Sequence, residues 1–127
     1  MGRNTLKLSD VMESADAAVK EFGKKHWTKP RDGKLYLIDP RTGNPEDLVG
    51  HTLARLGVEI PLHMAGSTVK RLDRKGAIDV DDDAYEFLLV LQDAQDDGDL
   101  WVEALILAEC WMIDITLPWN QPGYIAA

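Results

Sequence analysis

The chain has 127 residues, a formal net charge of −8 and one cysteine. This length favours one domain with an ordinary hydrophobic core, and 45% hydrophobic residues exclude a disordered chain. The single cysteine excludes an internal disulfide. We expect Cys110 to be buried and inert, because it lies in the most apolar segment.

The charges are unevenly divided along the chain. Residues 1–75 hold all 14 Lys and Arg beside ten acids, which gives +4. Residues 76–127 hold the other 12 acids and no Lys, Arg or His, which gives −12. Two interpretations stay open: the two halves neutralise each other in the fold, or the acids form a face that meets a basic partner.

Helical spacing of apolar residues predicts five helices, over about residues 10–22, 45–56, 68–75, 82–96 and 100–116. Asn44 is the expected N-cap of the second helix, with Pro45 in its first position. Gly50 lies inside that helix, where glycine costs about 1 kcal/mol relative to alanine. We therefore expect another element to approach the backbone closely at Gly50.

The segment between the first two helices contains a β-type run, KLYLI at residues 34–38, between two turns. A short helical turn is expected at residues 62–65, and the tail, 118–127, is expected to pack back on the core. Residues 84–117 should form a helical hairpin. These features predict a mainly α, single-domain helical bundle over residues 1–127, with a C-terminal helical hairpin and a minor β element.

The last helix is apolar enough to raise the question of a membrane span. It carries Glu103, Glu109 and Asp114, and no basic anchor follows it. The N-terminal residues also lack the apolar core of a signal peptide. We therefore predict a buried core helix, no membrane association and a cytoplasmic location.

Motifs for nucleotide, phosphate or hydrolase chemistry are absent from the sequence, since it holds no GxGxxG, Walker loop, GxSxG or HExxH. The nearest match is a calcium loop that starts at Asp93, but its twelfth position is Ala104 where a bidentate carboxylate is required. We expect no metal, no cofactor and no catalytic residue. An enzyme of another type stays an alternative, which a pocket that holds His51, His63 and acids would favour.

Two segments, LVGHTLARLGV at residues 48–58 and FLLVLQDAQDDGDLWVEALILAE at 87–109, carry a family resemblance. Over roughly residues 10–110 the chain resembles small uncharacterised cytoplasmic proteins of phages that infect actinobacteria. The resemblance implies no known activity, and Asp47 stands where the family often has Cys. The residues that match its second motif have turn and packing roles of their own, Trp101 as a core anchor among them: Gln92, Gln95, Asp96, Gly98, Trp101 and Ala104.

These observations predict a non-enzymatic phage accessory protein that binds a host or phage protein through an acidic face. The candidate contact residues are acids of the second half: Asp79, Asp81, Asp82, Asp83, Glu86, Asp93 and Asp97. The alternative is a DNA mimic or a nucleic-acid-associated protein, although we do not expect a chain of net charge −8 to bind nucleic acid directly. The apolar last helix and the tail are also consistent with a homodimer.

Overall fold

The computed structural model of the chain describes residues 5–30 and 33–116. The described residues form five α-helices and one short 3-10 helix: α1 (Leu8–Phe22), α2 (Leu48–Arg55), η1 (Leu62–Met64), α3 (Val69–Arg74), α4 (Asp82–Asp96) and α5 (Trp101–Thr116). The mainly α fold and all five predicted helices are confirmed, with ends that shift by at most three residues. The predicted packing of the tail, 118–127, lies outside the described residues.

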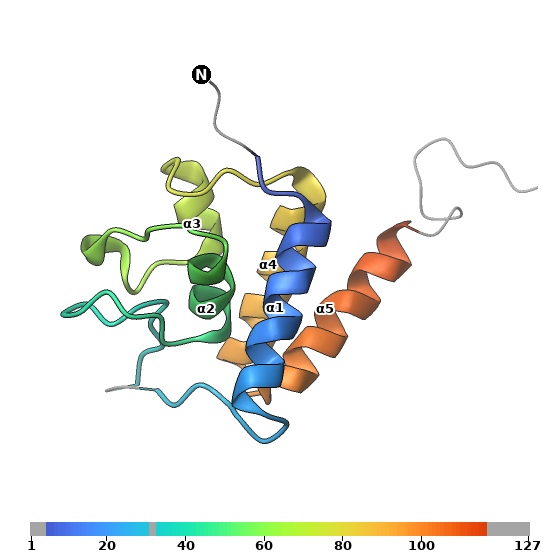
Figure 1. Cartoon of the computed structure of the whole chain (residues 1–127), viewed down its shortest axis with the longest axis horizontal. Coiled ribbons are helices and arrows are strands. Elements are labelled where there is room, and N and C mark those ends of the chain that lie inside the picture. The colour runs from blue at the N-terminus through green and yellow to red at the C-terminus, as the bar shows by residue number, and fades with distance from the viewer. Residues whose placement is uncertain (1–4, 31–32, 117–127) are drawn as a thin grey trace, which may run out of the picture.

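Helix α4 is the centre of the bundle and contacts each of the other four α-helices. In Figure 1, α1 lies in front of α4, with α2 and α3 on one side and α5 on the other. The predicted hairpin is confirmed, because α4 and α5 pack together across the turn at Gly98. The core between the helices includes the fully buried side chains of Phe87, Leu91 and Trp101, each of which contributes about 1.5–3 kcal/mol by leaving water.

Two glutamine side chains of α4 hold the first turns of α2 and α3. The Oε1 atom of Gln95 accepts a hydrogen bond of 2.8 Å from the N–H of Leu48, the first residue of α2. The Oε1 atom of Gln92 accepts one of 2.8 Å from the N–H of Val69, the first residue of α3. The first N–H groups of a helix have no partner within that helix. Both amides therefore satisfy donors that would otherwise be buried without a partner.

The N-cap of α2 is Asp47, so the prediction of Asn44 is wrong. The Asp47 carboxylate accepts a hydrogen bond of 2.6 Å from the N–H of Gly50. Asn44 belongs instead to the preceding turn, where its carbonyl accepts the Asp39 N–H at 2.8 Å. The helix therefore begins three residues later than expected.

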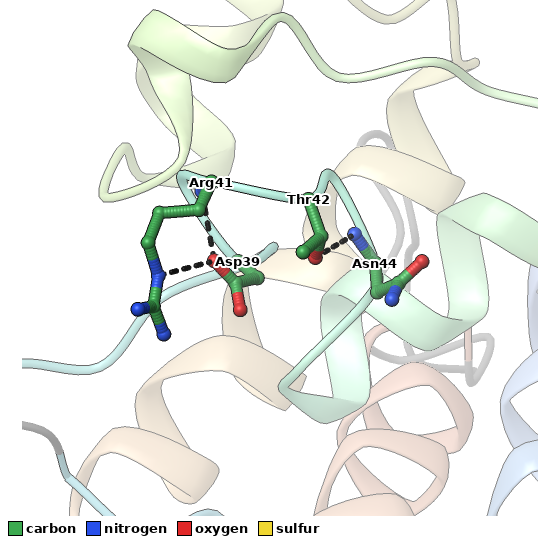
Figure 2. A network of polar contacts seen from close by, with 4 residues as sticks. All are labelled: Asp39, Arg41, Thr42 and Asn44. Carbon is green, nitrogen blue, oxygen red and sulfur yellow. Dashed lines mark hydrogen bonds and ion pairs between the residues drawn. The ribbon is translucent and has the colours of Figure 1, made fainter.

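Figure 2 shows how side chains stabilise this turn. The carboxylate of Asp39 accepts the backbone N–H of Arg41 at 2.8 Å and pairs with its Nε at 3.7 Å. The hydroxyl of Thr42 accepts the N–H of Asn44 at 3.3 Å. Short polar side chains that bond to nearby backbone groups favour a turn over a helix at this point.

The predicted strand at 34–38 is wrong in its extent, since the described residues contain no strand. Within residues 5–30 and 33–116, β pairing consists of isolated bridges, such as Ile38 with Pro45 and Leu6 with Val80. The reason is visible at Leu37, whose N–H donates to the Ala65 carbonyl at 2.8 Å. In the described part of the chain, the backbone partners Ala65, Asn44 and Glu46 of this segment lie in turns and loops and not in a second strand.

The close approach expected at Gly50 is confirmed. A Cβ atom added to Gly50 would overlap the carbonyl oxygen of Leu37. That oxygen cannot easily move away, because it accepts the N–H of Glu46 at 3.0 Å. The absence of a side chain at Gly50 thus lets the segment through Leu37 lie directly on α2.

We expect Gly50→Ala to destabilise the protein by about 1–3 kcal/mol or more, because overlap with a fixed carbonyl outweighs a helix-propensity gain of about 1 kcal/mol. Urea unfolding followed by circular dichroism measures the change. Gly66→Ala is the matched control, since its added Cβ would only touch the Tyr36 ring at 3.4 Å. Equal stability of the two variants would contradict the steric explanation.

Candidate functional site

A groove of about 420 Å³ lies between α4 and α5. Its apolar lining comes from both helices: Leu89, Val90, Ala94, Leu107 and Trp111. Its acidic lining comes from α4 and the turn that follows: Glu86, Asp93, Asp97 and Asp99. Among the described residues, no Lys, Arg or His lines this α4–α5 groove.

The groove follows from the spacing of residues on the two helices. Glu86, Val90, Asp93 and Asp97 recur every three or four residues, which places them on one face of α4. The opposite face of α4 carries the buried residues of the core. On α5, Leu107 and Trp111 are four residues apart and therefore lie on one face as well. Each helix thus has an inner face toward the core and an outer face toward the groove.

The outer face of α5 leaves much apolar surface exposed. The exposed fractions are 55% for Ile106, 50% for Leu107, 44% for Trp111 and 60% for Ile113. The prediction of a buried core helix therefore holds for the inner face of α5 and is wrong for this outer face. The physical reason is that α5 packs mainly against α4 and α1, which cover only its inner side. A helix that is apolar all round needs cover on every side, so the uncovered face is a candidate contact surface.

Cys110 is exposed on the same helix, so the prediction of a buried thiol is also wrong. The buried stripe of α5 consists of residues on the opposite side, such as Ala104, Ala108 and Met112. Local apolar composition therefore overestimated the burial of Cys110, because it does not tell how many elements pack around a helix.

Of the seven acids predicted to form a contact face, the structure brings three together in the groove: Glu86, Asp93 and Asp97. The other four lie at or before the start of α4. Asp81 is the N-cap and accepts the Ala84 N–H at 2.7 Å, and Asp79 accepts the Thr5 hydroxyl at 3.1 Å. Asp82 and Asp83 are exposed in the first turn, where acids favour the positive end of the helix dipole.

Sequence reasoning missed the apolar half of the groove. The four-residue spacing of Leu107 and Trp111 could have indicated it. These two residues form a second apolar stripe on α5, separate from the buried stripe of Trp101, Ala104 and Ala108. Two apolar stripes on one helix indicate two contact surfaces, of which the core can occupy only one.

The near-match to a calcium loop is not a loop in the structure. Asp93 and Gln95 lie within α4, and the Gln95 side chain is fully buried against Asp47 and Leu48. In the described part of the chain, no group of three or more His, Cys, Asp or Glu side chains is arranged to hold a metal ion.

The histidines that would have favoured an enzyme do not converge on a common pocket. His51 packs its ring against Phe22 and Trp101, with centroids 4.6 Å and 5.5 Å apart, while His63 lies on η1 beside Arg71. Burial, together with the nearby His26, lowers the pKa of His51. The Trp101 ring is fully buried and its indole Nε1 donates to the Thr28 hydroxyl at 2.8 Å, whereas Phe22, which packs on it, is 37% exposed. The His51 ring thus packs at the edge of the core.

Asp47 is the most strongly perturbed acid and therefore a second candidate for chemistry. Burial raises the pKa of Asp47 to about 7, although hydrogen bonds from Gln95 and Gly50 act in the opposite direction. Both carboxyl oxygens are occupied, one by the Gly50 N–H at 2.6 Å and the other by Gln95 Nε2 at 2.6 Å. The side chain is only 2% exposed, so it acts on stability and not on a bound molecule.

The raised pKa of Asp47 predicts how stability depends on pH. The folded chain keeps the Asp47 proton up to about pH 7, whereas the unfolded chain loses it near about pH 4. The contribution of this group to the free energy of unfolding is therefore greatest below about pH 4. It falls by up to about 1.4 kcal/mol per pH unit between about pH 4 and about pH 7, and does not change further above about pH 7.

The test compares the wild type with Asp47→Asn by urea unfolding from about pH 4 to about pH 8. The comparison cancels the opposite effect of His51, whose lowered pKa makes stability rise toward neutral pH. We expect the free energy of unfolding of the wild type to fall relative to that of the variant as pH rises. Parallel curves would show that Asp47 titrates in the folded protein as it does in the unfolded chain.

None of the described helices combines the length and the apolar character that a membrane crossing requires. Comparison of the chain with protein-family models, with curated proteins and with solved structures finds no match.

Proposed function

We propose that the chain is a non-enzymatic phage accessory protein of the cytoplasm that binds a host or phage protein. The α4–α5 groove would take a basic amphipathic helix of that partner. The single observation that carries the proposal is the pairing of exposed apolar residues, Leu107 and Trp111, with the carboxylates of Glu86, Asp93 and Asp97 in one groove. Helices that dock into grooves use such apolar anchors, and charges around them select the partner.

The dimensions of the groove suit a short helix. Glu86 and Asp97 are eleven residues apart along α4, which corresponds to about 16 Å or three helical turns. A partner helix of that length can place two or three apolar side chains between α4 and α5. Its lysines or arginines would then lie opposite the carboxylates, where they gain attraction without deep burial.

The charge of the groove favours a basic partner over a second copy of the chain. All the charged residues that line it are acids, and residues 76–127 contain no Lys, Arg or His. Two copies that met through this groove would bring carboxylates against carboxylates, which is unfavourable. The exposed apolar lining also favours a peptide over DNA mimicry, which requires carboxylates in place of phosphates and gains nothing from Trp111.

A synthetic peptide tests the proposal directly. The probe is a fluorescein-labelled amphipathic peptide with leucines at helical spacing and lysines elsewhere, and its binding is measured by fluorescence anisotropy. We expect binding that weakens with added salt, and a loss of at least about tenfold in affinity for the double variant Glu86→Lys with Asp93→Lys. Trp111→Ala should weaken binding by a similar or greater factor, since aromatic anchors dominate such contacts.

The control variant is Glu59→Lys with Asp73→Lys, which changes the net charge equally at exposed residues outside the groove. It should bind the peptide nearly as well as the wild type. A peptide with glutamates in place of lysines should not bind. Equal losses in the two double variants, or binding that Trp111→Ala leaves unchanged, would show that the peptide is held by general charge and not by the groove.

A further inference from the structure

A second surface pocket, of about 410 Å³, lies between η1 and α3. It is lined by Pro61, His63, Met64, Arg71, Lys75 and Ala77. Three of these residues carry basic side chains, and no acid of the described chain is among the lining residues. This η1–α3 pocket is therefore opposite in charge to the α4–α5 groove, and the proposed function does not use it.

The basic side chains of the pocket are available to a ligand. Arg71 and Lys75 are four residues apart, so they project from the same side of α3. Both are exposed, as is His63, and within the described residues neither Arg71 nor Lys75 forms an ion pair. Two permanent positive charges and an imidazole thus meet in one hollow without a carboxylate to neutralise them.

The backbone around the pocket is held in place by the core. Val69 and Leu72 of α3 are fully buried, and the N–H of Val69 donates to Gln92 of α4. On the other side of the pocket, Met64 is 4% exposed, and the following carbonyl, of Ala65, accepts the Leu37 N–H at 2.8 Å. A pocket whose walls are already fixed loses little entropy when a ligand binds.

We propose that the η1–α3 pocket binds the phosphate group of a small phosphorylated molecule. The guanidinium of Arg71 can donate two parallel hydrogen bonds to phosphate oxygens, Lys75 supplies a second positive charge, and His63 supplies a ring N–H. The apolar lining of Pro61, Met64 and Ala77 covers the part of the ligand that is not phosphate.

Two features oppose anion binding, and both are limited. The net charge of −8 acts through solvent, where charges more than about 8 Å away are largely screened at physiological salt. The pocket also lies near the C-terminal end of α3, whose carbonyls would repel an anion. Two of these carbonyls, of Arg71 and Leu72, already accept N–H groups, from Lys75 at 2.9 Å and Ala77 at 2.9 Å. Their repulsion of an anion is therefore reduced.

Titration calorimetry with inorganic pyrophosphate and with AMP tests the proposal, and a fluorescein-labelled single-stranded oligonucleotide is assayed separately by anisotropy. The pocket variant is Arg71→Ala with Lys75→Ala. The control is Lys70→Ala with Arg74→Ala, which removes the same charge from the same helix at exposed residues that do not line the pocket. Circular dichroism checks that both variants fold.

We expect saturable binding of at least one small phosphate, a loss of about tenfold or more in the pocket variant and little change in the control, because charge-assisted hydrogen bonds are lost only in the former. His63→Gln should weaken the same binding, because the ring N–H is lost, and should leave the circular dichroism spectrum unchanged. Absence of binding by both small molecules, equal losses in the two double variants, or binding of the oligonucleotide alone would each overturn the proposal.

Discussion

The fold depends on two uncharged side chains, the amides of Gln92 and Gln95. Helices α2 and α3 have eight and six residues, which is too short for stability in isolation. Their first N–H groups are buried, and an amide oxygen from α4 satisfies one of them in each helix. Gln95 also donates to Asp47, so the same amide bonds to the cap of α2 and to its first turn. The positions of α2 and α3 are therefore set by two residues of α4 that are one turn apart.

Helix α4 consequently connects the core with both proposed binding surfaces. Its inner face packs in the bundle, its outer face lines the α4–α5 groove, and Gln92 fixes the helix that carries Arg71 and Lys75. The uneven charge of the chain is thereby distributed over separate surfaces. Ion pairs such as Lys20–Asp16 and Arg55–Glu21 join bases to acids of the first half, which leaves the groove acids without bases among their lining residues. This arrangement favours an acidic face over mutual neutralisation of the two halves.

Much of the fold could be predicted from the sequence, because apolar spacing reports which face of each helix is buried. Even the contact at Gly50 was predictable, since a glycine inside a helix needs a compensating close approach. The predictions that were wrong depend on tertiary partners. Asn44 and Asp47 are both good N-caps by type, and only the burial of Asp47 beside Gln95 selects between them.

The candidate site shows the same division. The acids Glu86, Asp93 and Asp97 were predicted as contact residues because charge is visible in a sequence. The apolar half, Leu107 and Trp111, was assigned to the core because apolar character alone does not tell how many neighbours surround a helix. The hydrogen bonds that Gln92 and Gln95 make to α3 and α2 are also hard to predict. A glutamine inside a helix has no local role that differs from that of other polar residues.

The hydrogen bonds that Gln92 and Gln95 accept also have a consequence for how the protein opens. A transient movement of α4 away from the bundle would break the bonds to Leu48 and Val69 at the same moment. Neither α2 nor α3 is long enough to persist alone, so we expect these three helices to open as one cooperative unit whose amide hydrogens exchange with solvent together. The acidic groove and the basic pocket would appear and disappear as a pair, although they lie on different surfaces.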